Sequence, residues 1–392
     1  MILCLTIVRA SPTEVFTSEL STTKFLKHEE GSIDMRIVFD LDGVICELKK
    51  PSESYGEVKP KLDVIKLVNE LHSNGDHIII HTGRHMRTCD GNVNEVIKKV
   101  GKITKEWLKK NNVKYDELIF GKPHADMYID DLGVTFDSAD ELKVKMDGIK
   151  LNFIIPMGGE GKRFKNSKFN KPKFMIETKN KTLLEWAIQS LPLDFAHKIF
   201  FIIRKNDEQN FRVKEFIKKI MKEKFSNIKF EILLLSKNTR GQAETVLNCK
   251  KYINNDRGLL IFNNDTYFKS TRLKSRLLSM RNQKIDGILG IFNSNNPEYS
   301  FVKIDNENKV IKTKEKKVIS NFASTGMYIF SKGSDFIKSV EYAIEEEILS
   351  KNEFYISELY NILIKEGKKF TVDIADEFVT LGTPEDIKKF EA

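Results

Sequence analysis

The feature that most constrains this chain is a pair of aspartates directly after a short apolar run. Asp40 and Asp42 follow the run 37–39 and precede Gly43, so two carboxylates are expected at the mouth of a buried strand. Residues two apart in an extended strand point to the same side. Carboxylates that close repel each other unless a cation lies between them, and their hard oxygen ligands indicate Mg²⁺. One carboxylate can then attack phosphorus while the other transfers a proton; the alternative is an ordinary strand that ends in a solvated turn.

Polar groups also follow later apolar runs of the first 135 residues. Thr82 ends a second predicted strand, and Lys122 supplies a cation. A third strand, predicted over 127–131, ends in the paired carboxylates of Asp130 and Asp131. Open α/β sheets bind ligands at the edge where their strands end, so these groups are expected to meet there.

In this order, the four segments resemble the motifs of the haloacid-dehalogenase (HAD) superfamily of phosphatases, over about residues 35–135. The resemblance implies that Asp40 is the nucleophile and Asp42 the general acid/base. It also implies that Thr82 and Lys122 hold the phosphoryl oxygens, which suits a reaction that depends on positioning and charge neutralisation. The implied Mg²⁺ ligands are Asp40, Asp42, Asp130 and Asp131.

The spacing of these motifs limits the substrate. From Asp42 to Thr82 is 40 residues, and from Thr82 to Lys122 is another 40. Each gap has room for a crossover helix and loops but not for a separate lid domain, so a capless phosphatase with an open site is expected. Other side chains near this edge could touch the substrate, although each is predicted to be an ordinary solvated loop residue: Tyr55, Arg84, His85 and Arg87.

A glycine-rich loop opens the second half of the chain. It follows the apolar run 151–155 and contains Gly158, Gly159, Gly161 and Arg163. The glycines let the backbone fold closely around an anion, and a guanidinium can bind phosphate oxygens bidentately. The spacing differs from the G-x-G-x-x-G of dinucleotide-binding folds, which argues against that class.

Further polar positions follow the loop in a fixed order. Lys173 precedes a short apolar run, Gln242 opens a predicted helix, and Asp265 ends a predicted strand. The later positions are Glu315, Lys316, Gly326 and the closing segment Leu381-Gly382-Thr383. Over about residues 150–392 this set resembles the sugar-phosphate nucleotidylyltransferases, which join a nucleoside triphosphate to a phosphorylated sugar or alcohol and release pyrophosphate.

On the nucleotide side, the resemblance implies that the loop holds the triphosphate and that Arg163 neutralises the leaving pyrophosphate. Lys173 would lie beside the reacting phosphates and Gln242 near the base. Asp265 would bind the Mg²⁺ that bridges nucleotide and acceptor phosphate. The nucleotide would be CTP, GTP or UTP, a choice that the sequence leaves open.

On the acceptor side, the resemblance implies that Glu315 and Lys316 grip the hydroxyls and phosphate of the acceptor, and that Gly326 gives the sugar close access. The chain departs from many relatives at 380–381, where these carry an aspartate that acts as a second metal ligand. Asp373 and Asp376 lie a few residues upstream. Either one of them replaces that ligand, with Asp373 as a weak candidate, or the second ligand is missing.

Composition indicates a soluble enzyme of two domains. The 392 residues are 40% hydrophobic and carry a net charge of +9, which suits anionic substrates. The basic residues are spread over helices, so no nucleic-acid site is predicted. Four cysteines without metal-ligand spacing indicate a reducing, cytoplasmic location, and the apolar run 1–8 is too short to span a membrane. A homo-oligomer is left open.

The expected fold class is α/β, with two domains that are each a mainly parallel sheet flanked by helices. We expect a disordered extension over 1–34, a capless HAD-like (Rossmann-like) phosphatase over 35–149, and a Rossmann-type nucleotide-diphospho-sugar transferase-like domain over 150–392. The function hypothesis is a bifunctional enzyme that prepares precursors of capsule or lipopolysaccharide-type glycans. The alternative is that only one domain is catalytic and the other binds substrate or regulates.

Overall fold

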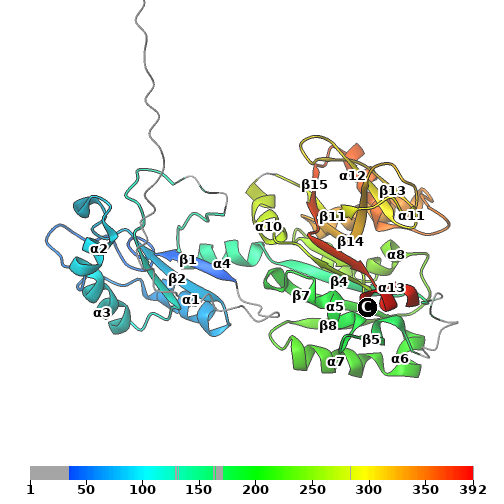
Figure 1. Ribbon diagram of the computed structural model, residues 1–392, viewed down its shortest axis with the longest axis horizontal. Helices are drawn as coiled ribbons and strands as arrows, with labels where there is room; N and C mark the ends of the chain where they lie inside the picture. The colour runs from blue at the N-terminus through cyan, green and yellow to red at the C-terminus, as the bar shows by residue number, and fades with distance from the viewer. Residues whose placement is uncertain are drawn as a thin grey trace, which may run out of the picture. The chain divides into compact units, whose positions relative to one another are not determined.

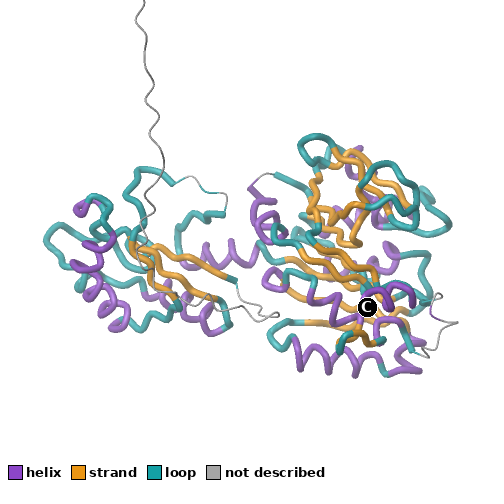
Figure 2. The backbone as a smooth tube through the Cα atoms, in the orientation of Figure 1, coloured by secondary structure: helices purple, strands orange, loops and turns teal. Residues whose placement is uncertain are grey.

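The computed structural model describes residues 35–128, 130, 132–161, 164, 171–282 and 284–391. Within this part of the chain, residues 35–149 and residues 150–391 each build a main sheet of their own, with helices between the strands (Figures 1 and 2). We call them the first and the second region. The extension predicted over 1–34 lies outside the described residues.

The first region contains a parallel sheet of three strands in the order β1, β2, β3. The strands are β1 (Arg36–Asp40), β2 (His77–Thr82) and β3 (Glu117–Phe120). Parallel neighbours need crossover connections, and these contain α1 (Leu62–Ser73), α2 (Val93–Val96), a π-helical turn (Ile97–Gly101) and α3 (Lys102–Lys110). Trp107 of α3 is 2% exposed and donates its indole N–H to the Val58 carbonyl at 2.8 Å, which fixes α3 on the core.

The strand predicted over 127–131 is not formed at the described positions, so that prediction was wrong there. Met127 and Tyr128 have no strand partner and are 75% and 53% exposed, and Asp130 is exposed as well. Ordering a strand costs backbone entropy that pairing and burial must offset, and apolar side chains left in solvent provide no such gain. Ile129 and Asp131 lie outside the described residues.

The two regions are joined by a short connection. Helix α4 (Ala139–Gly148) begins at Ser138, whose hydroxyl accepts the Glu141 backbone N–H at 3.2 Å. An N-cap of this kind satisfies one of the free N–H groups at a helix start. Strand β4 (Leu151–Met157) begins soon after α4 ends, so the junction is as short as the sequence predicts.

The second region contains a nine-stranded sheet. Its parallel part has the order β9, β4, β7, β8, and β14 extends it with antiparallel partners β9, β11 and β12. The sheet is therefore mixed, and its part β9, β4, β7, β8 is parallel, as predicted for the sheet of this region. Its strands besides β4 are β7 (Ala196–Arg204), β8 (Phe230–Leu235), β9 (Leu259–Phe262), β11 (Gly287–Asn293), β12 (Ser300–Ile304), β13 (Val310–Glu315), β14 (Phe322–Phe330) and β15 (Phe370–Ile374).

Both faces of this sheet are covered by helices (Figure 1). One face packs on α5 (Leu183–Gln189), α7 (Val213–Lys224) and α10 (Leu273–Asn282). The other packs on α8 (Gln242–Leu247), α9 (Lys250–Ile253), α11 (Gly333–Glu345) and α12 (Ile356–Lys365). The smaller elements are β5 (Glu177–Thr178), β6 (Lys181–Thr182), α6 (Lys205–Phe211), β10 (Thr266–Lys269), β16 (Glu377–Thr380) and α13 (Pro384–Glu391).

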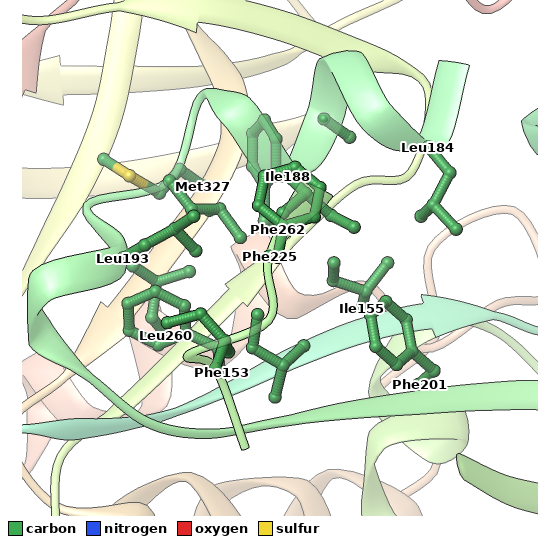
Figure 3. Close-up of a cluster of buried hydrophobic side chains, with 14 of the residues drawn as sticks. Phe153, Ile155, Leu184, Ile188, Leu193, Phe201, Phe225, Leu260, Phe262 and Met327 are labelled. Carbon is green, nitrogen blue, oxygen red and sulfur yellow. The ribbon is translucent and has the colours of Figure 1, made fainter. Parts of the chain in front are cut away.

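The position of strand β4 explains why all of its residues except Asn152 are apolar. Phe153 and Ile155 point into the core on the α5 and α7 side, where they meet Phe201 and Phe262 (Figure 3). Ile154, between them, belongs to the core on the opposite face. A parallel strand buried on both faces needs apolar residues at every position. No helix in the described part of the chain combines the length and the apolar character needed to cross a membrane.

Candidate active sites

A cavity of about 530 Å³ lies where the parallel strands β4 and β9 end. The loop after β4 and the segment after β9 form part of its wall, and the turn before α8 forms another part. Of the residues predicted to bind substrate or metal, the wall contains Gly158, Gly159, Gly161, Lys173, Gln242 and Asp265. The structure therefore brings the nucleotide-side positions together at the edge of the sheet where open α/β folds bind ligands.

The three glycines of the loop differ in what they do. A Cβ atom on Gly158 would lie 3.0 Å from the Thr245 hydroxyl and 3.0 Å from Leu235, so Gly158 allows α8 to pack closely. Gly159 and Gly161 have open space at the same position, and Gly161 has a φ of +61°. Their backbone is thus free to approach a bound anion, as predicted. Arg163 lies outside the described residues.

Asp265 and Lys173 form an ion pair inside the cavity wall, with side chains that are 16% and 23% exposed. The Asp265 backbone carbonyl accepts the Leu381 N–H at 2.9 Å, which places Gly382 beside the carboxylate. A Cβ atom on Gly382 would lie 3.3 Å from Asp265 Oδ2, so this glycine leaves the carboxylate accessible. The closing segment therefore contributes to the site through its backbone.

A single accessible carboxylate fits a Mg²⁺ ion that arrives with a nucleotide. Among the residues that the structure describes, no three His, Cys, Asp or Glu side chains gather as a metal cage. Mg²⁺ does not require one, because it commonly takes one or two carboxylates and completes its shell with substrate phosphates and water. Asp265 can supply that carboxylate.

Two asparagines directly before Asp265 are functional candidates that the sequence reasoning missed. The Asn263 side-chain oxygen accepts a hydrogen bond from Gln242 Nε2 at 2.7 Å, and both residues line the cavity. Asn264 is 5% exposed and donates to the Pro156 carbonyl at 3.2 Å, which ties the end of β9 to β4. The sequence signal that could have identified them is a pair of amide side chains directly after a predicted buried strand.

The family of the second region follows from comparison with known proteins. Residues 153–389 match the family model named Nucleotidyl transferase, which is more than half of the chain. The chain belongs to this nucleotidyl transferase family. The match does not include the first region.

Relatives of the nucleotidyl transferase region are distant. The bifunctional protein GlmU of Methanococcus vannielii is 26% identical over 248 residues, which are 60% of this chain and 53% of that protein. The bifunctional sugar-1-phosphate nucleotidylyltransferase/acetyltransferase of Sulfurisphaera tokodaii is 23% identical over 232 residues, 59% of this chain and 52% of that protein. The chain thus spans about half the length of these curated relatives. A solved nucleoside-diphosphate-sugar pyrophosphorylase of Vibrio cholerae RC9 is 28% identical with a TM-score of 0.52, covering 61% of this chain and 99% of that one.

The predicted acceptor-side residues of the transferase region lie away from the cavity wall. Glu315 is 8% exposed and accepts hydrogen bonds from Ser300 and, at 3.2 Å, from Ser357. Burial raises the pKa of its carboxyl group above the ordinary value. The Lys316 ammonium lies 5.7 Å from the centre of the Tyr355 ring. The wall contains neither Glu315 nor Lys316, so their roles stay predictions.

Asp373 does not approach Asp265. It is 1% exposed, accepts a hydrogen bond from the Ser270 hydroxyl at 3.0 Å, and lies 3.7 Å from Arg276 Nε. Burial raises the pKa of its carboxyl group.

In the first region, the ends of β1, β2 and β3 bring together an ion pair and a hydroxyl–carboxylate contact. Asp40 is paired with Lys122, whose side chains are 29% and 22% exposed. Thr82 is fully buried, and its hydroxyl lies 3.4 Å from Asp42 Oδ2. Nucleophile, lysine, hydroxyl and second acid of the predicted phosphatase motifs therefore do meet at one edge.

Arg84 is the residue of the first region that sequence reasoning placed wrongly. It was predicted as a solvated loop residue, but its side chain is fully buried. Its guanidinium donates to both oxygens of Asp42, from Nε at 2.9 and 3.0 Å and from Nη2 at 2.9 Å. The guanidinium carbon also lies 4.5 Å from the centre of the Tyr55 ring. Desolvation of a guanidinium is costly without a carboxylate partner, which explains the pairing with Asp42.

Three of the four predicted metal ligands of the first region, Asp40, Asp42 and Asp130, are described, and they do not gather as a metal site. Both oxygens of Asp42 are engaged by Arg84, and Asp40 is engaged by Lys122 and by the Leu41 N–H at 2.9 Å. Asp130 is exposed and accepts the Leu132 N–H at 2.7 Å, while Asp131 lies outside the described residues. As they stand, these side chains do not fit a Mg²⁺ site.

Proposed function

We propose that residues 150–392 transfer a nucleotidyl group from a nucleoside triphosphate to the phosphate of a sugar, a polyol or an amino alcohol, with release of pyrophosphate. The observation that carries this proposal is the cavity in which the glycine loop, Lys173 and Asp265 meet. The relative from Sulfurisphaera tokodaii has sugar-1-phosphate nucleotidylyltransferase in its name, which supports the same reaction class.

In this reaction, an oxygen of the acceptor phosphate forms a bond to the α-phosphorus of the nucleotide. The bond from that phosphorus to the bridging oxygen of pyrophosphate breaks, and the charge on the phosphates must be neutralised throughout. Lys173 is a cation in the cavity wall that can do so, and Asp265 would hold the Mg²⁺ that accompanies the nucleotide. The open backbone at Gly159 and Gly161 suits the triphosphate.

The test is a screen of CTP, GTP and UTP against sugar, polyol and amino-alcohol phosphates in the presence of Mg²⁺. We expect pyrophosphate release with at least one pair, and a product whose mass equals that of the acceptor plus a nucleoside monophosphate less water. Lys173→Met should lower the rate of that pair. Binding of a nucleotide without pyrophosphate release from any pair would contradict the proposal.

We propose a second activity for residues 35–149, the hydrolysis of a phosphate monoester with Asp40 as nucleophile. The meeting of Asp40, Lys122 and Thr82 at one sheet edge favours it. Phosphate release from sugar and polyol phosphates should be measured with and without Mg²⁺ in the full chain. The competing hypothesis, a module that binds substrate or regulates transfer, would be supported if no ester is hydrolysed and an Asp40 variant changes the transferase kinetics.

We further propose that the two activities act on one building block for a surface glycan. Hydrolysis would remove one phosphate from a sugar bisphosphate, and transfer would load the remaining monophosphate onto the nucleotide. With a bisphosphate as the acceptor, nucleotide-sugar formation should then be lost in Asp40→Asn and restored by adding the monophosphate. If the variant converts the bisphosphate as well as the wild type does, the order is wrong, and the hydrolase acts after transfer or beside it.

A further inference from the structure

Gly326 lies within β14 at a position where no side chain fits. Its φ is +82°, and a Cβ atom there would lie 2.7 Å from Asn263 Cγ and closer still to Asn263 Nδ2. The space beside Gly326 is therefore occupied by the amide of Asn263. Gly326 itself is not in the cavity wall, whereas Asn263 is. This differs from the role expected from the sequence, in which Gly326 gives the sugar close access.

Asn263 in turn holds Gln242. Its side-chain oxygen accepts a hydrogen bond from Gln242 Nε2 at 2.7 Å, so one of the two N–H groups of that amide is engaged. The side-chain oxygen of Gln242 accepts no hydrogen bond from the described part of the chain. Because Gln242 lines the cavity, that oxygen remains available to an N–H group of a ligand.

The backbone of Gln242 is held as firmly as its side chain. Gly241, which precedes it, has a φ of +124°, and a Cβ atom there would lie 2.7 Å from the backbone N and O of Phe354. The Phe354 carbonyl accepts the Ala243 N–H at 3.0 Å, and the Phe354 N–H donates to the Arg240 carbonyl at 2.7 Å. With the helix start fixed in this way, the contact with Asn263 is what fixes the side chain.

We propose that Asn263 is a positioning residue that holds the Gln242 amide in the orientation in which it meets the nucleobase, and that Gly326 serves the nucleotide side by making room for Asn263. This inference rests on the proposed nucleotidyl transfer. Asn263 then acts on nucleotide affinity through Gln242. This can be distinguished from a direct contact between Asn263 and the nucleotide. Its removal should weaken nucleotide binding only while Gln242 is present.

The test measures the Kd for the Mg²⁺ complex of whichever of CTP, GTP and UTP binds the wild type, by calorimetry on the full chain. One neutral hydrogen bond corresponds to a roughly 2- to 12-fold change in Kd, so Asn263→Ala and Gln242→Ala should each raise Kd within that range. The double variant should bind no more weakly than Gln242→Ala alone. Additive losses would overturn the proposal, because they would mean that Asn263 contacts the nucleotide independently.

Gly326 provides a second readout. Gly326→Ala should raise Kd for the nucleotide, and adding Asn263→Ala to it should produce no further loss, while KM for the acceptor changes little in either. A rise in acceptor KM with an unchanged nucleotide Kd would overturn the proposal in favour of a sugar-side role. Asn227→Ala, which removes an exposed amide in the turn between α7 and β8, is the matched control for Asn263→Ala. If none of the three nucleotides binds, the proposed transferase function itself fails.

Discussion

Asp265 and Asp42 each lie just beyond the carboxyl end of a strand, one in the second region and one in the first. Asp265 faces a cavity and is paired with Lys173, a side chain that is itself 23% exposed. Asp42 is paired with Arg84, whose side chain is fully buried and bonds to both carboxylate oxygens. A lysine is a single charge on a flexible stem that can move to a phosphate, whereas a buried guanidinium fork fixes its partner. The two acids are similarly exposed, 16% for Asp265 and 20% for Asp42, so the difference lies in the partner, which is movable in one region and fixed in the other.

Asp40 resembles Asp265 more closely than it resembles its own neighbour Asp42. It is also paired with a partly exposed lysine, Lys122. The comparison therefore predicts that the lysine-paired acid of each region takes part in chemistry and that the arginine-paired acid has a fixed, orienting role. Four substitutions test this division.

The largest effect is expected for Asp40→Asn. An amide cannot act as the nucleophile, so phosphate release should fall to the uncatalysed background if the first region is a phosphatase. Nucleotidyl transfer to a monophosphate acceptor should be unchanged. Asp63→Asn, which alters an exposed carboxylate of α1, is the matched control and should leave both activities intact. Phosphate release at the wild-type rate in Asp40→Asn would show that Asp40 is not the nucleophile. The first region would then have no lysine-paired catalytic acid to compare with Asp265.

Arg84→Met should destabilise the first region by roughly 3–5 kcal/mol, the cost of breaking a buried ion pair by removing one partner. Urea unfolding can be followed by the fluorescence of Trp107, which lies 6.0 Å from the Arg84 guanidinium, in a Trp186→Phe background. Arg87→Met is the control, since Arg87 is exposed and its loss should change stability by no more than about 0.5 kcal/mol. Equal effects of the two substitutions would show that Arg84 does not hold Asp42.

Asp265→Asn should lower nucleotidyl transfer by at least roughly 10²-fold, the scale lost when one preorganised group is removed from a transition state. Phosphate release should stay at the wild-type rate. Asp256→Asn is a suitable control, because Asp256 is an exposed carboxylate whose partner is Lys332. A loss of less than about threefold in Asp265→Asn would mean that the accessible acid of the cavity has no part in catalysis.

The sequence predicted well those features that depend on local pattern. The mostly apolar run 151–155 predicted a strand that the structure buries on both faces, and the motifs predicted a shared site for Lys173, Gln242 and Asp265, which line one cavity. Such features follow from periodicity and from the rule that ligands bind where parallel strands end.

Features that depend on one tertiary contact were not predictable from the sequence. Arg84 is buried because it pairs with Asp42, a carboxylate 42 residues earlier in the chain. The residues next to it in the sequence are typical of a polar loop. The space beside Gly326 of β14 is filled by the side chain of Asn263, which lies in the connection between β9 and β10. The strand expected over 127–131 is not formed for the converse reason, because Met127 and Tyr128 have no strand partner and stay exposed.

The smallest effect on nucleotidyl transfer is expected for Asp373→Asn. This substitution tests whether a buried acid outside the cavity wall takes part in the reaction. Nucleotidyl transfer should stay near the wild-type rate, since Asp373 faces Ser270 and Arg276 and not the cavity.

Burial raises the pKa of Asp373 above its ordinary value of 3.8, so its contribution to stability is present below that pH and is lost as the pH rises through the raised pKa. The asparagine variant stays neutral and should gain on the wild type from about pH 4 upward, by about 1.4 kcal/mol for each unit of the raised pKa. Asp376→Asn is the control with the opposite sign, because hydrogen bonds from Thr271 lower the pKa of that exposed carboxylate. Unfolding free energies measured from pH 2 to pH 8 should therefore show two separate windows. Asp373→Asn should gain on the wild type above about pH 4, whereas Asp376→Asn should fall behind it as the pH rises towards about 4 and keep a constant deficit above that. The same pH dependence in Asp373→Asn as in the wild type would mean that burial does not raise the pKa of Asp373, and a loss of transfer as large as that of Asp265→Asn would return Asp373 to the metal site.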